Sequence, residues 1–156
     1  MTTDPPYTLA DSWLLNHRVN LLLLEQLSDE QLAFAANPRA RSIADQFAHL
    51  HNVRIMWLEP RVPAVARKLQ KLEKGKAAKK SLAESLEASA NAIAELIAES
   101  EKAGKLKSYK RGLVAFFGYA LAHEAHHRGQ IILHLKQAGM KIDPAVGFQL
   151  WEWEKI

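Results

Sequence analysis

The chain of 156 residues contains no cysteine. Disulfides, thiolate ligands and a protein thiol nucleophile are therefore excluded, and any bound metal must be held by nitrogen and oxygen. Long apolar runs are also missing, because the most apolar early run, residues 21–24, is too short to span a bilayer. Residues 1–6 lack the basic region and apolar core of a signal peptide. We therefore expect a cytoplasmic protein with no membrane partner.

The balance of residue types is that of an ordinary globular protein. Apolar residues make up 48% and charged residues 24%, and the length suits one domain over residues 1–156. The net charge is +4, and most of the positive excess lies in residues 67–80. No aromatic residue alternates with these lysines to stack on bases. We therefore expect a solvated helix end and linker there, and no nucleic-acid partner.

No segment shows a sustained strand pattern or an Asn-Gly hairpin turn, so a sheet is not expected. Pairs of capping residues instead mark helix starts at Thr8, Ser42 and Ser81. We predict an all-α protein, a four-helix bundle with short extra helical segments and a C-terminal tail packed on it. The long helices are expected to cover residues 9–27, 43–58, 82–104 and 110–138; short helical segments are expected at 28–34 and 62–72, and the tail at 141–156.

The motif His-Glu-Ala-His-His-Arg-Gly-Gln at residues 123–130 suggests a metal site. His123 and His127 are four residues apart and share one face of the expected last helix, close enough to bind a single ion. A lone histidine on an apolar face is usually a satisfied core residue, but two buried imidazoles both need partners. His126 lies well off that face. His134 shares the face but is nearly two turns beyond His127. We therefore expect it to pack in the core or to support a metal-binding histidine without binding the ion itself.

Two upstream histidines compete to be the third ligand. His49 and His51 are two residues apart on the expected helix 43–58, so they face nearly opposite directions and only one can join the site. His51 lies nearer the apolar centre of that helix, whereas His49 lies on a half-polar stripe that suits a pocket. Periodicity leaves the choice open. His17, alone on the first helix, is expected at the edge of the core.

Several stretches resemble the DinB-like superfamily, also called the DinB/YfiT family of metalloenzymes, over essentially the whole chain. They are residues 42–50 (Ser-Ile-Ala-Asp-Gln-Phe-Ala-His-Leu), Trp57-Leu58, residues 123–130, Gly147 and Trp151-Glu152-Trp153.

This resemblance implies a four-helix bundle, frequent homodimers, and a divalent ion, nickel or zinc, on His49, His123 and His127. It also implies transfer reactions with a low-molecular-weight thiol as co-substrate, such as bacillithiol or mycothiol, or hydrolase reactions on small molecules. The family name reflects gene induction by DNA damage and implies no contact with DNA.

Three neutral imidazoles would leave the full charge of the ion to acidify a bound water or thiol. Glu124 is the nearest candidate base, although it points about a quarter-turn away from His123 and a structural role competes. Asp45 and Gln130 are candidates to orient the imidazoles from behind. Arg128 is a candidate structural ion-pair partner. We therefore predict a metal-dependent hydrolase or thiol S-transferase.

Rival interpretations exist. The string His-Glu-Ala-His-His satisfies the HExxH signature of zinc peptidases, but the chain lacks their substrate-binding sheet, and the extended spacing would need glycine at 130 and histidine at 133. A di-iron carboxylate bundle would need a second Glu-x-x-His, which is absent. The remaining alternative is a non-enzymatic metal-binding bundle or interaction module, whose metal site would be closed by a fourth protein ligand.

Overall fold

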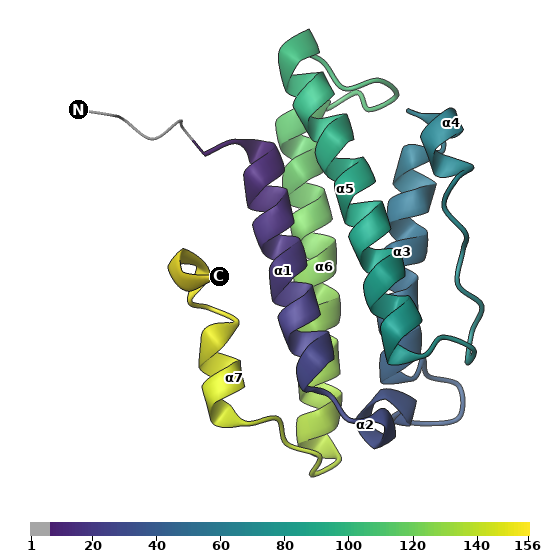
Figure 1. Ribbon diagram of the computed structural model, residues 1–156, viewed down its shortest axis with the longest axis vertical. Helices are drawn as coiled ribbons and strands as arrows, with labels where there is room; N and C mark the ends of the chain where they lie inside the picture. The colour runs from purple at the N-terminus through teal and green to yellow at the C-terminus, as the bar shows by residue number, and fades with distance from the viewer. Residues whose placement is uncertain (1–6) are drawn as a thin grey trace.

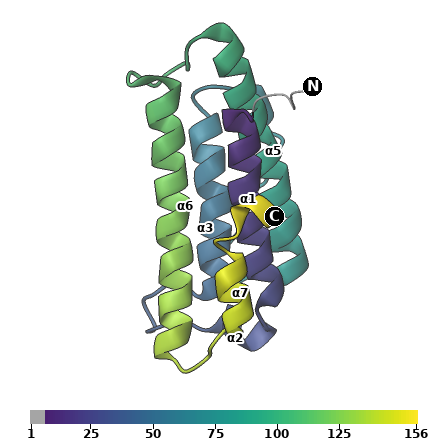
Figure 2. The ribbon, with the colours of Figure 1, turned by 90° about the vertical axis from the view of Figure 1, so that its left-hand side faces the viewer.

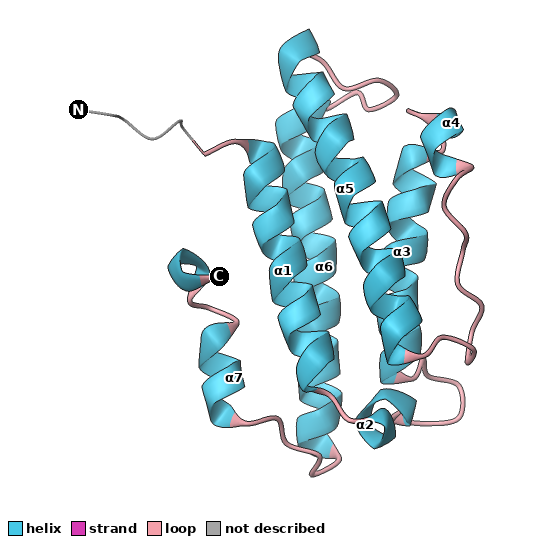
Figure 3. Cartoon of the chain, viewed as in Figure 1, coloured by secondary structure: helices cyan, strands magenta, loops and turns pink. Residues whose placement is uncertain are grey.

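Four long helices form the molecule, and the computed structural model describes residues 7–156 of the chain. They are α1 (Leu9–Gln26), α3 (Ile43–Leu58), α5 (Lys79–Ala103) and α6 (Gly112–Gln137), as Figure 1 shows. No strand occurs in that described part (Figure 3). The predicted all-α bundle is confirmed. The prediction that residues 1–6 form no signal peptide concerns residues outside the described range.

The helices are arranged so that α3 and α6 are neighbours. Helix α5 packs against α1 and α3, and α6 packs against the same two helices from the other side. Figures 1 and 2 show α1 and α6 running in one direction and α3 and α5 in the other. Because α3 and α5 are parallel, a long crossover over residues 59–78 must join them. Two antiparallel helices that are distant in sequence, α3 and α6, thus share a surface.

Polar caps fix the starts of the first helices as the sequence predicts. Thr8 and Asp11 form a capping box before α1, and Ser28 and Gln31 form another before the short α2 (Asp29–Ala33). The Ser42 side chain accepts a hydrogen bond from the Asp45 backbone N–H at the start of α3. These contacts satisfy backbone donors that the first turn leaves free.

The helix start predicted at Ser81 is wrong. Helix α5 begins at Lys79, so Ser81 lies inside its first turn, and the N-cap residue Ala78 offers no side-chain acceptor. The Ser81 hydroxyl instead donates to the Ala78 carbonyl at 2.9 Å. The predicted end near Gly104 is confirmed, since Gly104 adopts a left-handed φ of 65° directly after Ala103.

The helix expected over residues 62–72 is also mostly wrong, because only α4 (Pro63–Ala66) forms. Side chains of α3 take the backbone groups that a longer helix would use. His51 Nε2 lies 2.9 Å from the Gln70 carbonyl, and the Asn52 amide bonds both the N–H and the carbonyl of Leu72 at 2.9 Å. These contacts hold the crossover against α3 without a continuous helix.

The C-terminal segment folds back on the bundle, as expected for an apolar tail. It contains α7 (Pro144–Gln149) and the short 3-10 helix η1 (Trp153–Lys155). Leu150 is buried in the core and Trp153 packs against the same cluster, whereas Trp151 is 85% exposed. Within residues 7–156, none of the helices combines the length and apolar character that crossing a bilayer requires.

Candidate metal centre

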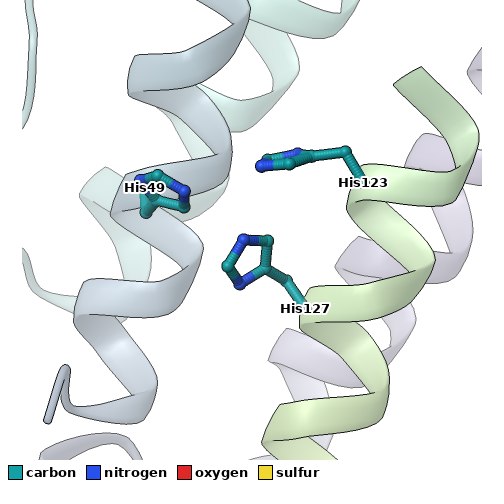
Figure 4. Close-up of side chains that lie close together, drawn as sticks. All are labelled: His49, His123 and His127. Carbon is teal, nitrogen blue, oxygen red and sulfur yellow. The ribbon is translucent and has the colours of Figure 1, made fainter. Parts of the chain in front are cut away.

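Three histidine side chains converge between α3 and α6 (Figure 4). His49 comes from α3, and His123 and His127 come from adjacent turns of α6. One ring nitrogen of each lies within 4.8 Å of the others. The ring centroids of His49 are 5.5 Å from His123 and 4.7 Å from His127. The structure therefore brings together the three residues that the resemblance implied, and it selects His49 over His51 for this cluster.

Helical repeat explains the cluster. Four residues advance a helix by slightly more than one turn, so His123 and His127 stack along the side of α6 that faces α3. Trp57, two turns after His49 on α3, closes one side, with its ring edge-to-face on His123 at 5.5 Å. Tyr119, one turn before His123, lies beside it at 6.4 Å and is half exposed. Aromatic rings thus flank the cluster on the side of His123.

Most ring nitrogens of the cluster have no protein partner. Within residues 7–156, neither His49 nor His123 makes a hydrogen bond, and Nδ1 of His123 is buried without a partner. Buried imidazole nitrogens are normally paired, so a partner other than protein is expected. Tetrahedral coordination of zinc at about 2.0–2.1 Å separates its ligand atoms by about 3.4 Å, so small side-chain rotations would suffice to close the cluster. The donor set and its spacing fit a divalent ion.

His127 is oriented by Gln46, a buried residue of α3. Its Nδ1 donates to Gln46 Oε1 at 3.2 Å, because an amide oxygen can only accept. The proton therefore lies on Nδ1, and the lone pair of Nε2 is free for a metal. The Gln46 amide nitrogen lies 3.5 Å from Nδ1 of His134. His134 thus stands behind the cluster, linked to it through Gln46, as its position on the stripe predicted.

The surroundings favour neutral rings. Burial lowers the pKa of His49 to about 4, with smaller contributions from Arg41 and His123. Burial likewise lowers the pKa of His127 to about 4, reinforced by the charges of His123 and His49. The pKa of His123 is lowered too, again chiefly by burial. All three rings are therefore unprotonated at neutral pH, which is the state that binds metal.

A pocket of about 190 Å³ opens beside His49. Its rim carries the cationic side chains Arg41 and Lys74, and Leu72 of the crossover forms part of its wall. Within residues 7–156, neither cation has an ion-pair partner. The carboxylate of Asp45 lines the same pocket, so the two cations leave an excess of one positive charge beside the histidine cluster, and this excess raises the local concentration of anions. The pocket is therefore suited to a negatively charged group.

The other histidines lie outside the cluster. His51 is buried against the crossover, where it contacts the Gln70 carbonyl. His126 is exposed on α6, although its ring lies 5.3 Å from that of His127. His17, expected at the edge of the core, is buried and lies 2.8 Å from a carboxylate oxygen of Glu87.

Glu124 belongs to a buried polar network. Its side chain is fully buried, and its two oxygens accept from Nε and Nη2 of Arg54 at 2.7 and 3.0 Å. The side-chain amides of Asn16 and Asn20 donate to Oε2, each at 2.7 Å. Arg128 Nη1 in turn donates to the oxygens of both asparagines. A carboxylate with this many partners is held in the core, which argues against the role of base. Arg128 makes no ion pair within residues 7–156, so the role of ion-pair partner is not observed, and Arg128 supports the network through the two asparagines instead.

Two further residues were candidates to support the ligands. Asp45 accepts from the backbone N–H of Gly75 at 2.7 Å and so tethers the crossover. Gln130 is half buried and makes no hydrogen bond within residues 7–156. Neither contacts an imidazole of the cluster through a hydrogen bond, and Gln46 occupies the supporting position instead.

Sequence reasoning missed Arg54, Asn16 and Asn20 altogether. A signal was present, because Arg54 falls on the apolar stripe of α3 seven residues after Phe47 and four before Leu58. A charge on such a stripe must be paired, and a glutamate in the corresponding stripe of another helix is the natural partner.

The family model described as the DinB family matches residues 1–154 of the chain. No curated protein and no solved structure matches the chain.

Proposed function

The chain belongs to the DinB family, and on this basis we propose that it is a metal-dependent enzyme whose divalent ion, nickel or zinc, is held by His49, His123 and His127. The reaction is hydrolysis, or transfer of a low-molecular-weight thiol to an electrophile. The observation that carries the proposal is the convergence of three imidazoles, two of which make no hydrogen bond to residues 7–156.

The donor set determines what such a site can do. Three neutral imidazoles add no negative charge, so a bound ion would lower the pKa of a coordinated water or thiol and would accept an anionic ligand. Gln46 fixes the ring of His127, and Trp57 limits the movement of His123. Arg41 and Lys74 attract a carboxylate or phosphate of the substrate toward the pocket beside His49. In this proposal Asp45 and Glu124 hold the scaffold and move no proton.

A non-enzymatic metal-binding module is the second candidate. It would be favoured by a fourth protein ligand closing the site. Within residues 7–156, the cluster of potential metal ligands contains three residues and no fourth. A pocket adjoins one of the three ligands. An open site next to a pocket supports the enzyme.

The zinc peptidase interpretation loses support, because Glu124, the general base of that motif, is bound by Arg54 and two asparagines.

Metal analysis tests the site. The protein is purified without added metal, loaded with nickel or zinc and dialysed, together with His49→Ala, His123→Ala and His127→Ala. We expect close to one ion per chain in the parent and a loss of at least tenfold in affinity in each variant. His126→Ala is the matched control, because it removes an exposed imidazole from the same helix and should leave metal content unchanged. Metal retained by His123→Ala with unchanged affinity would contradict the proposed site.

Activity assays separate the two reactions. Thiol-dependent consumption of an electrophile is compared with hydrolysis of simple esters and amides, with and without loaded metal. Arg41→Gln should raise KM for anionic substrates more than for neutral ones, whereas Arg39→Gln, in the same loop, should not. A folded, metal-loaded protein without either activity would favour the binding module.

We also propose a homodimer located in the cytoplasm, as the family resemblance implies. Sedimentation equilibrium over a range of protein concentrations tests the dimer, and a single species at the mass of one chain would contradict it.

A further inference from the structure

A second cavity, of about 530 Å³, lies on the side of α6 that faces away from the histidine cluster. Ala125, Gly129 and Ile132 of α6 form one wall, and Trp151 and Trp153 of the C-terminal segment form the opposite wall. The surface is predominantly apolar, and its volume lies in the range of small-molecule sites. The small side chains of α6 leave a space between this helix and the C-terminal segment.

One charged side chain, Arg128, reaches this apolar cavity. Its Nη1 is occupied by the oxygens of Asn16 and Asn20, at 2.7 and 2.8 Å. Its Nε and Nη2 make no hydrogen bond to residues 7–156, and they are not among the buried polar atoms that are sealed from solvent. Three N–H donors of the guanidinium are therefore left for a molecule in the cavity.

The charge balance of the buried network is incomplete. It contains two guanidinium groups, Arg54 and Arg128, and one carboxylate, Glu124. Both oxygens of Glu124 are bonded directly to Arg54, so the excess positive charge lies at Arg128, beside the cavity. Arg128 is half buried and has no carboxylate partner among residues 7–156, so an anion in the cavity would gain a charge-assisted contact with it. A second protein chain docked here would have to bring an acidic side chain to the same point, whereas a volume of about 530 Å³ matches a small molecule.

We propose that this cavity binds a small amphipathic carboxylate, its apolar part packed between α6 and the two tryptophans and its carboxylate on the free edge of Arg128. A medium-chain fatty acid or an arylalkanoic acid has this chemistry. A bidentate contact between guanidinium and carboxylate would set the orientation. The site is separate from the histidine cluster and does not depend on the proposed metal.

Decanoate is the probe, and decanol of the same chain length is its uncharged match. Binding is measured by tryptophan fluorescence, because Trp151 and Trp153 line the cavity, and by calorimetry below the concentrations at which either compound aggregates. We expect saturable binding of one decanoate per chain and at least tenfold weaker binding of decanol. Equal affinity for the two compounds, or no saturable binding of decanoate, would overturn the proposal.

A variant that fills the cavity locates the site. Ala125→Phe adds a ring to the cavity wall without removing any member of the polar network, and Ala115→Phe adds the same ring to an exposed position of α6 outside the cavity. We expect at least a tenfold loss of decanoate affinity in the first and none in the second, with both variants as helical as the parent. Undiminished binding by Ala125→Phe would overturn the proposal. So would sedimentation showing that this variant dissociates a dimer while the parent binds no decanoate, because the cavity would then be an interface between copies.

Discussion

Replacing Glu124 by glutamine should destabilise the protein strongly while keeping the shape of the side chain. The carboxylate is fully buried and accepts four hydrogen bonds, two from Arg54 and one each from Asn16 and Asn20. Glutamine removes the negative charge and turns one acceptor into a donor that faces other donors. Breaking a buried ion pair by removing one partner costs about 3–5 kcal/mol. At roughly 2–4 °C per kcal/mol for a chain of this size, the Tm should fall by about 6–20 °C.

Urea unfolding followed by circular dichroism at 222 nm measures this change. Glu84→Gln is the control, because its carboxylate is largely exposed and lies 3.9 Å from Lys80, so the free energy of unfolding should change by less than about 0.5 kcal/mol. Combining Glu124→Gln with Arg54→Met should cost less than the sum of the two single variants, since they share one interaction. A free energy of unfolding for Glu124→Gln within about 1 kcal/mol of the parent would refute the reasoning.

The same network predicts a pH dependence. Burial alone would raise the pKa of Glu124, but the charge of Arg54 and the hydrogen bonds from Arg54 and Asn20 outweigh it and lower the pKa. A lowered carboxyl pKa stabilises the fold above the pKa of the unfolded chain, about 4.3, and this contribution is lost as the pH falls further. The difference in stability between the parent and Glu124→Gln should therefore be constant near neutrality and shrink in acid. A constant difference down to pH 3 would contradict the assignment.

Three other predictions concern the histidine cluster and the crossover. Gln46→Met should weaken zinc binding by about 10–100-fold in calorimetry while leaving the protein folded, because His127 loses the group that fixes its ring; unchanged affinity would contradict this. In metal-free protein, His49 and His127 have pKa values of about 4, below the unfolded value of about 6.5, so stability should be complete above pH 6.5 and decline as the pH falls toward 4. Urea midpoints that stay flat from pH 7 to pH 4.5 would argue against neutral buried rings. Asp45→Ala should lower the free energy of unfolding by about 1 kcal/mol through the lost bond to Gly75, with no effect on metal affinity; a tenfold weaker affinity would assign Asp45 to the metal site instead.

The sequence predicts the bundle well because local signals and the apolar periodicity agree. Thr8 and Ser42 each precede a periodic segment, and both become helix caps. Ser81 has the same local pattern and fails, because the chain is already helical from Lys79, so the Glu84 N–H that Ser81 would cap is already bonded within the helix. The crossover fails for a different reason: Asn52 competes for its backbone groups from another element, and no local pattern contains that information.

The candidate site has the same limit: spacing within one helix can be predicted from the sequence, whereas packing between helices cannot. The spacing of His123 and His127 is a property of one helix, and it was sufficient to pair them. The choice of His49 over His51 depends on where α6 and the crossover lie around α3, so the wheel alone left it open. The supporting role of Gln46 could not be predicted for the same reason, since its two partners, His127 and His134, both lie on α6.

One wall of the pocket beside His49 is provided by the crossover, and the other is provided by α3. The α3 anchors Asp45, His51 and Asn52 hydrogen-bond to the backbone of residues 70–75. Because these bonds involve only backbone groups of the crossover, they do not depend on which side chains the crossover carries. Lys74, which is exposed, can therefore be exchanged without disturbing the imidazoles or the core, whereas Leu72 also packs against the core. Two proteins with the same histidines and anchors could therefore differ in the molecules that this pocket accepts while the architecture stays constant.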